Sequence, residues 1–267
     1  MTKTTVPDHS YGIAYLEGLA APGALPTNMA FLPPSKIDAA YSHVIYVNTA
    51  IRGTGAQKMW VLERRPSDPH GWALALWDQE FWDKNGLERG KAPPYSWTVS
   101  TGRVYPGDRR SGPTPVGIFN MDDRRTRHRP GWGSRGMYNS IYIDLHYSSG
   151  RASGIAMHGT TKGLYRRLGR ADSHGCIRMT QKNSQLVWDM FHPGNVKGEK
   201  SPYWGQVPRY FKSTPKSGYS ARYGYVRDGS FLYSTPAGNN EDQTVQVSQR
   251  LSKAGYTSLF VFFRDDL

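Results

Sequence analysis

The chain has 267 residues and a formal net charge of +13, and it is rich in tyrosine, phenylalanine and tryptophan as well as in glycine and proline. This composition favours a β-rich fold over a helical bundle, and the length suffices for one large domain with appendages. A single cysteine excludes a disulfide within the chain, no apolar run is long enough to span a membrane, and the charge attracts polyanions in general.

Strands are predicted wherever β-branched and aromatic residues gather between turn residues. In chain order they occupy residues 43–48, 57–63, 72–77, 95–101, 115–120, 140–146, 154–158 and 257–263. The first two are joined by a glycine turn and should form a hairpin. The strand at 140–146 shows strict alternation of apolar and polar side chains, which is typical of a half-buried strand.

Helices are predicted at four places. They lie near residues 13–19, at 79–85, at 181–191 and at 243–254. The segment 163–171 is expected to be a loop with at most one helical turn. A basic, proline-containing stretch at 122–135 is expected to be a long loop, either solvated or bound to an anionic polymer.

The residues that indicate chemistry surround the only cysteine. Cys176 follows His174 and Gly175, and a second histidine lies upstream at His158, next to Gly159. A thiol becomes a useful nucleophile as a thiolate, so a catalytic cysteine needs a nearby base or positive field. Glycine beside the nucleophile allows a tight turn that presents backbone N–H groups to an oxyanion.

This pattern resembles the signature of the YkuD-type L,D-transpeptidases of bacterial cell walls. The family pairs a His-Gly with a downstream Ser/Thr-His-Gly-Cys, and here His158 precedes Cys176 by 176 − 158 = 18 positions. Segments 100–103, 114–119 and 154–158 resemble the strands that precede the motif in that family, in the same order, and the resemblance covers roughly residues 55–195. It implies a mainly β, sandwich-like catalytic domain with a few helices and irregular terminal extensions.

The resemblance also implies catalytic roles. Cys176 would be the nucleophile and His158 its base, with the imidazole oriented through its other nitrogen. Backbone N–H groups of Gly175 and Cys176 would hold the oxyanion. His174 would either hold the turn or bind the acyl donor, and Ser173 is expected to cap the turn.

Substrate contacts are expected from a further set of residues. Arg178 would hold a substrate carboxylate or form an internal salt bridge, and both readings stay open. Gly159, Tyr142 and Arg151 are further candidates for substrate contact. A zinc site built from the histidines and the cysteine is disfavoured because the usual paired-cysteine spacing is missing, and no cofactor motif is found.

The implied reaction is attack on the L,D-peptide bond of a peptidoglycan stem peptide, with release of D-alanine and transfer to an amine, giving a 3–3 cross-link or another attachment. L,D-carboxypeptidase activity on the same stem peptides is one alternative. A non-catalytic, basic cell-wall-binding protein is the alternative from another class. A sortase, the nearest rival enzyme, is disfavoured because sortases lack a Ser-His-Gly next to the cysteine. Nucleic acid is not expected as a partner.

The sequence suggests three parts: an N-terminal arm at 1–50, a catalytic domain at 51–198 and a C-terminal extension at 199–267 that would act as an accessory wall-binding or lid module. The first residues lack the order of a signal peptide. We expect a periplasmic or cell-envelope enzyme whose export signal has been removed, with a cytoplasmic enzyme acting on recycled wall peptides as the alternative.

Overall fold

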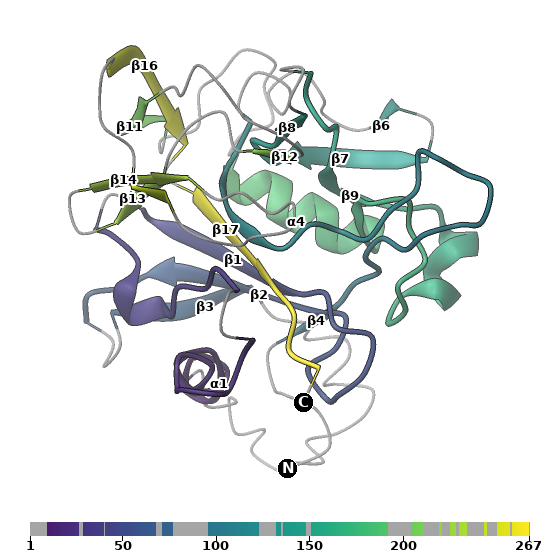
Figure 1. Cartoon of the computed structure of the whole chain (residues 1–267), viewed down its shortest axis with the longest axis horizontal. Coiled ribbons are helices and arrows are strands. Elements are labelled where there is room, and N and C mark those ends of the chain that lie inside the picture. Colours follow the sequence, from purple (N-terminus) through teal and green to yellow (C-terminus); the bar gives the residue numbers. More distant parts are fainter. Residues whose placement is uncertain are drawn as a thin grey trace, which may run out of the picture.

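Two main sheets and a few helices make up the part of the chain that can be described (Figure 1). The computed structural model describes residues 10–26, 29–39, 41–67, 71–76, 96–122, 132–134, 136–147, 151–191, 204–210, 219–220, 225–227, 230–233, 243–244, 250–256 and 258–266. Strands dominate over helices in these residues, so the predicted mainly β, sandwich-like fold class is confirmed.

The first sheet has six strands. They are β1 (His43–Asn48), β2 (Lys58–Arg64), β3 (Trp72–Leu76), β4 (Trp97–Thr98), β5 (Gly117–Asn120) and β17 (Ser258–Phe263). The order is β3-β2-β1-β17-β5, with β4 paired to β2. The antiparallel pairing of β1 with β2 confirms the predicted hairpin.

Strand β17 comes from near the C-terminus yet lies in the interior of this sheet. It pairs parallel with β1 and antiparallel with β5, and all six of its residues are buried. The predicted buried strand at 257–263 is therefore confirmed. Strands β1 and β17 both come from outside the predicted catalytic range 51–198 and complete the sheet that contains β2 and β5. The three-part division itself stays a prediction.

The second sheet has the order β10-β9-β7-β6. Its strands are β6 (Trp132–Ser134), β7 (Met137–Tyr142), β9 (Ala156–Gly159) and β10 (Ile177–Met179). Helix α4 (Gln181–Phe191) follows β10 directly, has the bounds that the sequence predicted and contacts β7 and β9. Only β9 and β10 run parallel in this sheet, and this pair carries the motif residues.

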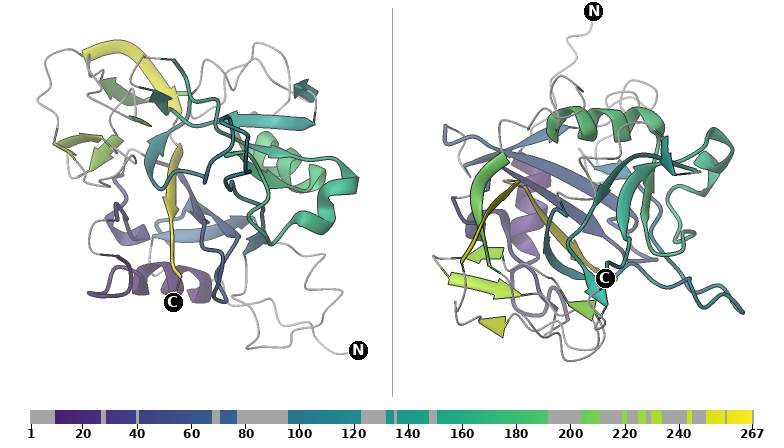
Figure 2. Two further views of the ribbon diagram at one scale, coloured as in Figure 1. Left: turned by 45° about the vertical axis from the view of Figure 1, so that its right-hand side comes forward. Right: turned by 90° about the horizontal axis from the view of Figure 1, so that it is seen from above.

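Two hydrophobic cores lie on opposite faces of the first sheet. The core between the sheets contains Ile45 and Val47 of β1, Met157 of β9 and Trp188 of α4. Alternate β1 residues enter the other core, which α1 (Ser10–Gly18) covers together with the segment around the short helix η1 (Pro34–Lys36). Figure 2 shows α1 on the side of the first sheet away from α4. Because β1 is buried on both faces, it lacks the polar alternation of a surface strand.

Two sequence-based predictions are corrected. The helix expected at 243–254 is wrong, because β15 (Gln243–Thr244) and β16 (Arg250–Tyr256) are strands, and β16 pairs with β11 (Trp204–Tyr210). Three apolar residues at helical spacing gave a weak signal, and pairing with a distant strand overrode it. The strand expected at 140–146 begins earlier, as β7, and ends at Tyr142.

The remaining strands are short, and one prediction cannot be compared. They are β8 (His146–Tyr147), β12 (Tyr219–Ser220), β13 (Tyr225–Arg227) and β14 (Ser230–Tyr233). Strand β8 pairs with β12, and β14 pairs with both β13 and β15. The helix predicted at 79–85 and most of the basic stretch at 122–135 lie outside the described residues.

Candidate active site

Strand pairing brings the cysteine and the upstream histidine to neighbouring strands. His158 lies within β9, and Cys176 immediately precedes β10. The parallel register sets Arg178 opposite His158 and Ile177 opposite Met157, and the last two side chains enter the core. Because side chains alternate along a strand, His158 and Arg178 share the other face, and Cys176 lies next to them at the start of β10.

The His158 imidazole is buried and held in one orientation. His158 is only 4% exposed, and its Nδ1 atom is 3.0 Å from the carbonyl oxygen of Gly159. A carbonyl can only accept, so Nδ1 carries the proton in the neutral ring and Nε2 keeps its lone pair. This is the geometry of a base oriented through its other nitrogen.

Burial also sets the charge state of His158. It lowers the pKa of the imidazole to about 4; the bond to the Gly159 carbonyl opposes this effect, and the nearby positive charge of Arg178 adds to it. The ring is therefore neutral near pH 7. A neutral imidazole can accept a proton, and the low pKa makes that transfer uphill until charge develops on a substrate.

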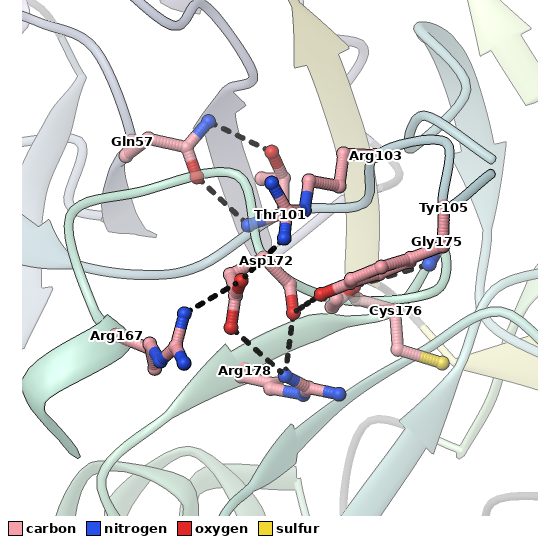
Figure 3. A network of polar contacts seen from close by, with 10 residues as sticks. Gln57, Thr101, Arg103, Tyr105, Arg167, Asp172, Gly175, Cys176 and Arg178 are labelled. Atoms are coloured by element: carbon pink, nitrogen blue, oxygen red, sulfur yellow. Dashed lines mark hydrogen bonds and ion pairs between the residues drawn. The ribbon is translucent and has the colours of Figure 1, made fainter. Parts of the chain in front are cut away.

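Cys176 is partly exposed and forms no disulfide. Its sulfur lies 3.7 Å from the carbonyl oxygen of Gly154, a long and weak hydrogen bond with the thiol as donor. Figure 3 shows the sulfur pointing away from Asp172. The Cys176 residue is thus partly exposed, and its sulfur lies against the backbone just before β9.

The turn before Cys176 is closed by Ser173. The Ser173 hydroxyl accepts a hydrogen bond from the Gly175 N–H at 3.1 Å and donates a short one to the Cys176 carbonyl. Gly175 has φ +143, a value that side-chain-bearing residues rarely adopt. Ser173 therefore shapes the turn, and the oxyanion role predicted for Gly175 would require its N–H to leave the Ser173 hydroxyl.

The loop after β4 supports this turn from the other side. The Thr114 hydroxyl donates to the Gly175 carbonyl at 2.7 Å and accepts from the Gly102 N–H at 2.8 Å. A Cβ on Gly102 would lie 2.3 Å from the Gly112 oxygen and 2.5 Å from the Gly175 Cα. Segment 100–103 thus approaches the nucleophile turn so closely that only glycine fits at position 102.

Sequence reasoning missed Gln57, which anchors this loop. Its buried carboxamide donates to the Thr101 hydroxyl at 2.7 Å and accepts from the Thr101 N–H at 2.8 Å. The same nitrogen reaches the carbonyls of Thr49 and Ala50. The Thr101 carbonyl in turn accepts from the N–H groups of residues 172 and 173. No local pattern marks Gln57, because its partners lie elsewhere in the chain.

Sequence reasoning also missed Asp172, which lies among three arginines (Figure 3). Its carboxylate is 3.3 Å from both Arg103 and Arg167 and 4.0 Å from Arg178. Arg178 also donates to the Asp172 carbonyl at 2.7 Å, and its side chain is only 17% exposed. Two roles were left open for Arg178, a hold on a substrate carboxylate and an internal salt bridge. Its described contacts, both with Asp172, are internal to the protein.

His174 points to the surface beside the loop after β4. Its Nε2 lies 3.1 Å from an Asp108 carboxylate oxygen, and its side chain is 54% exposed. The ring stacks on Tyr105 with centroids 4.7 Å apart. The Tyr105 hydroxyl donates to the Asp172 carbonyl at 2.6 Å. A half-buried tyrosine ring and an exposed imidazole therefore adjoin the nucleophile turn.

The three remaining candidates are placed differently. Gly159 packs against α4, since a Cβ there would lie 2.3 Å from the Ser184 hydroxyl. Tyr142 is 4% exposed, which leaves little of its surface for a substrate. Arg151 is exposed, with its guanidinium 4.7 Å from the centre of the Tyr147 ring.

Neither a metal cluster nor a membrane helix is found in the part of the chain that the structure describes. No group of three histidine, cysteine, aspartate or glutamate residues there could hold a metal ion. No helix there is long and apolar enough to cross a bilayer.

Comparisons with solved structures return L,D-transpeptidases at low similarity. One solved in complex with imipenem has 17% identity over 56% of this chain and 54% of its own, with a TM-score of 0.30. One from Mycobacterium smegmatis has 16% identity, the same two coverages and a TM-score of 0.29. L,D-transpeptidase 3 from Mycobacterium tuberculosis has 17% identity over 56% of this chain and 57% of its own, with a TM-score of 0.29.

This chain thus aligns with little more than half the length of each of these proteins. A search of curated proteins finds no match. The family model named YkuD, the L,D-transpeptidase catalytic domain, matches residues 79–199. The resemblance carried by the motifs is therefore confirmed over residues 79–199, where this chain matches the YkuD-type L,D-transpeptidase catalytic domain.

Proposed function

We propose that the chain is a cysteine-dependent L,D-transpeptidase that acts on peptidoglycan stem peptides. The observation that carries this proposal is the parallel pairing of β9, which contains the oriented His158, with β10, which Cys176 immediately precedes. The match of residues 79–199 to the L,D-transpeptidase catalytic domain supports the choice of substrate class.

In the first half-reaction the Cys176 sulfur attacks the carbonyl carbon of the third stem residue. The thiol proton passes to Nε2 of His158, and the new imidazolium is stabilised by the Gly159 carbonyl at Nδ1. Collapse of the tetrahedral intermediate breaks the L,D-peptide bond. The leaving nitrogen takes the proton from Nε2, so D-alanine departs with a neutral amine and a thioester remains.

In the second half-reaction an amine of another stem peptide attacks the thioester carbonyl. His158 accepts the proton from that nitrogen and returns it to the Cys176 sulfur as the thioester breaks. The product is a 3–3 cross-link, and another amine acceptor gives attachment instead. Both halves need one nucleophile and one base, and neither consumes a cofactor.

Mass spectrometry of reaction products tests the proposal. Purified tetrapeptide muropeptides are incubated with the wild-type chain and with Cys176→Ala and His158→Gln. We expect loss of D-alanine, dimer formation and a transient protein adduct of one acyl group in the wild type. Cys176→Ala should give none of these. Because the chain has one cysteine, the adduct has one thiol to which it can be assigned.

Other outcomes assign the chain elsewhere. Loss of D-alanine with monomeric tripeptide as the sole product would identify an L,D-carboxypeptidase on the same stem peptides. Turnover that survives in Cys176→Ala would disprove the cysteine mechanism. Binding to isolated wall without turnover by either protein would support a non-catalytic, basic wall-binding protein.

The proposed substrate lies outside the cytoplasmic membrane, so we propose the periplasm or cell envelope as the site of action. Cell fractionation followed by detection of the native protein tests this. Recovery in the cytoplasmic fraction alone would contradict it.

A further inference from the structure

The cluster around Asp172 contains more positive than negative charge. Arg103 and Arg167 meet the same carboxylate oxygen at 3.3 Å, and Arg178 approaches the other at 4.0 Å. Three guanidinium groups around one carboxylate leave a local excess of 3 − 1 = two positive charges. These arginines come from the loop after β4, from η2 (Lys162–Arg167) and from β10.

The three arginines differ in exposure. The Arg178 side chain is 17% exposed and contacts both the carboxylate and the carbonyl of Asp172, so its interactions are mainly internal. Arg103 and Arg167 have side chains that are 49% and 43% exposed. Each uses one terminal nitrogen on Asp172. A guanidinium has five N–H donors in a planar fork, so each retains donors for a second carboxylate.

A series of side-chain contacts joins this cluster to the nucleophile turn. The Arg103 guanidinium lies 4.4 Å from the centre of the Tyr105 ring, and that ring stacks on His174. The Tyr105 hydroxyl also donates to the Asp172 carbonyl, which fixes the ring against the cluster. His174 is two positions before Cys176. A peptide that reaches the thiol across these side chains would pass the exposed guanidinium groups.

We propose that Arg103 and Arg167, held together by Asp172, form a subsite that binds a free carboxylate of the acyl-donor peptide. The subsite rests on the proposed function for its substrate, a stem peptide rich in carboxylates. The sulfur of Cys176 points away from Asp172, so the subsite lies to one side of the thiol (Figure 3). Asp172 is a positioning residue, because it sets the two guanidinium groups without touching the substrate.

Two alkylating agents that differ mainly in charge test the subsite without any peptide. Iodoacetate is an anion and iodoacetamide is neutral, and both label the single cysteine. We expect the ratio of their rates at Cys176, normalised to free cysteine, to fall about threefold in Arg103→Gln and in Arg167→Gln, because each removes one charge. The difference should shrink in 0.5 M salt, where the screening length is short, on the order of 4 Å.

Arg166→Gln is the matched control, because Arg166 is an exposed neighbour of Arg167 in η2 outside the cluster. It should leave the ratio unchanged. Arg103→Lys and Arg167→Lys keep the charge and should restore most of the ratio. A variant that merely disturbs the fold would alter the rate with iodoacetamide as well, so the neutral agent reports on folding. An unchanged ratio in both glutamine variants would overturn the subsite.

A second measurement identifies the bound group. Tetrapeptide donors with each carboxylate converted in turn to a carboxamide are compared by kcat/KM. We expect one amidated donor to lose about tenfold with the wild type, and this preference to disappear in Arg103→Gln and Arg167→Gln. A preference that persists in both variants would overturn the assignment to these arginines.

The two measurements separate this proposal from the proposed function. If no donor is turned over while the alkylation ratio falls as expected, the function is wrong and the anion subsite stands. If donors are turned over while the ratio is unchanged, the function stands and the subsite is wrong.

Discussion

Acid should destabilise the folded chain through His158. Burial lowers the pKa of this imidazole to about 4 in the folded protein, against 6.5 for the exposed side chain. Between these values the unfolded chain binds a proton that the folded chain does not, so folding stability falls as the pH falls. The difference between the two pKa values is 6.5 − 4 = 2.5. It corresponds to a loss of unfolding free energy of about 3 kcal/mol below pH 4 and of about 2 kcal/mol at pH 5.

The assay is urea unfolding of the wild type and of His158→Gln at pH 7.5 and pH 5. Glutamine changes packing as well as charge, so the quantity compared is the change in unfolding free energy between the two pH values. We expect the wild type to lose about 2 kcal/mol more than the variant. His43 is a second buried imidazole. Burial lowers its pKa to about 4, and the charge of Glu63 opposes this effect, so His43→Gln should remove a loss of stability at pH 5 of similar size.

Equal pH dependence of the wild type and His158→Gln would refute the reasoning. It would mean that the imidazole is solvated or paired well enough to take up its proton in the folded state. Such a group would also be a stronger base than the neutral, desolvated one described here, and the pH dependence of turnover would then rise with a pKa near 6.5.

Three further substitutions test the framework around the site. Gly102→Ala should lower the unfolding free energy in urea by about 3 kcal/mol and remove most of the activity, since its Cβ would lie 2.3 Å from the Gly112 oxygen. The control Gly112→Ala has no atom within 4 Å of its Cβ and should leave stability nearly unchanged. Equal effects of the two substitutions would contradict this reasoning. Gln57→Leu should lower stability by about 3 kcal/mol, because buried groups including the Thr101 hydroxyl and N–H lose their partner; an unchanged melting temperature would show that they find another. Phe262→Ala, a fully buried position in β17, should cost about 4 kcal/mol by calorimetry, and a loss below about 1 kcal/mol would mean that the C-terminal strand is dispensable.

Local signals in the sequence were enough for several elements. The helix at 181–191 was predictable because its apolar residues recur at helical spacing and a proline and a glycine follow it. The hairpin of β1 and β2 was predictable because two β-rich runs flank a glycine turn. The helix predicted at 243–254 failed because helical spacing was its main support, and the pairing of β16 with β11 is a contact between distant segments.

The spacing of the motif by itself was enough to predict the chemistry that we propose. One cysteine after Ser-His-Gly, with a His-Gly 18 positions earlier, indicates a nucleophile and a base whatever surrounds them. These signals are local, because each depends on residue type and separation along the chain. They predict which groups react and leave open what holds those groups in place.

Tertiary structure alone decided what supports the site. Strand β17 reaches β1 across 258 − 43 = 215 positions, and the Gln57 carboxamide reaches a loop more than 40 positions away. Asp172 gathers arginines from three separate elements. No periodicity encodes such contacts, because their free energy arises from burial and hydrogen bonding that exist only after the chain has folded. The sequence by itself therefore determined which groups are proposed to react, and the fold decided the orientation and charge state of His158 and the contacts around Cys176.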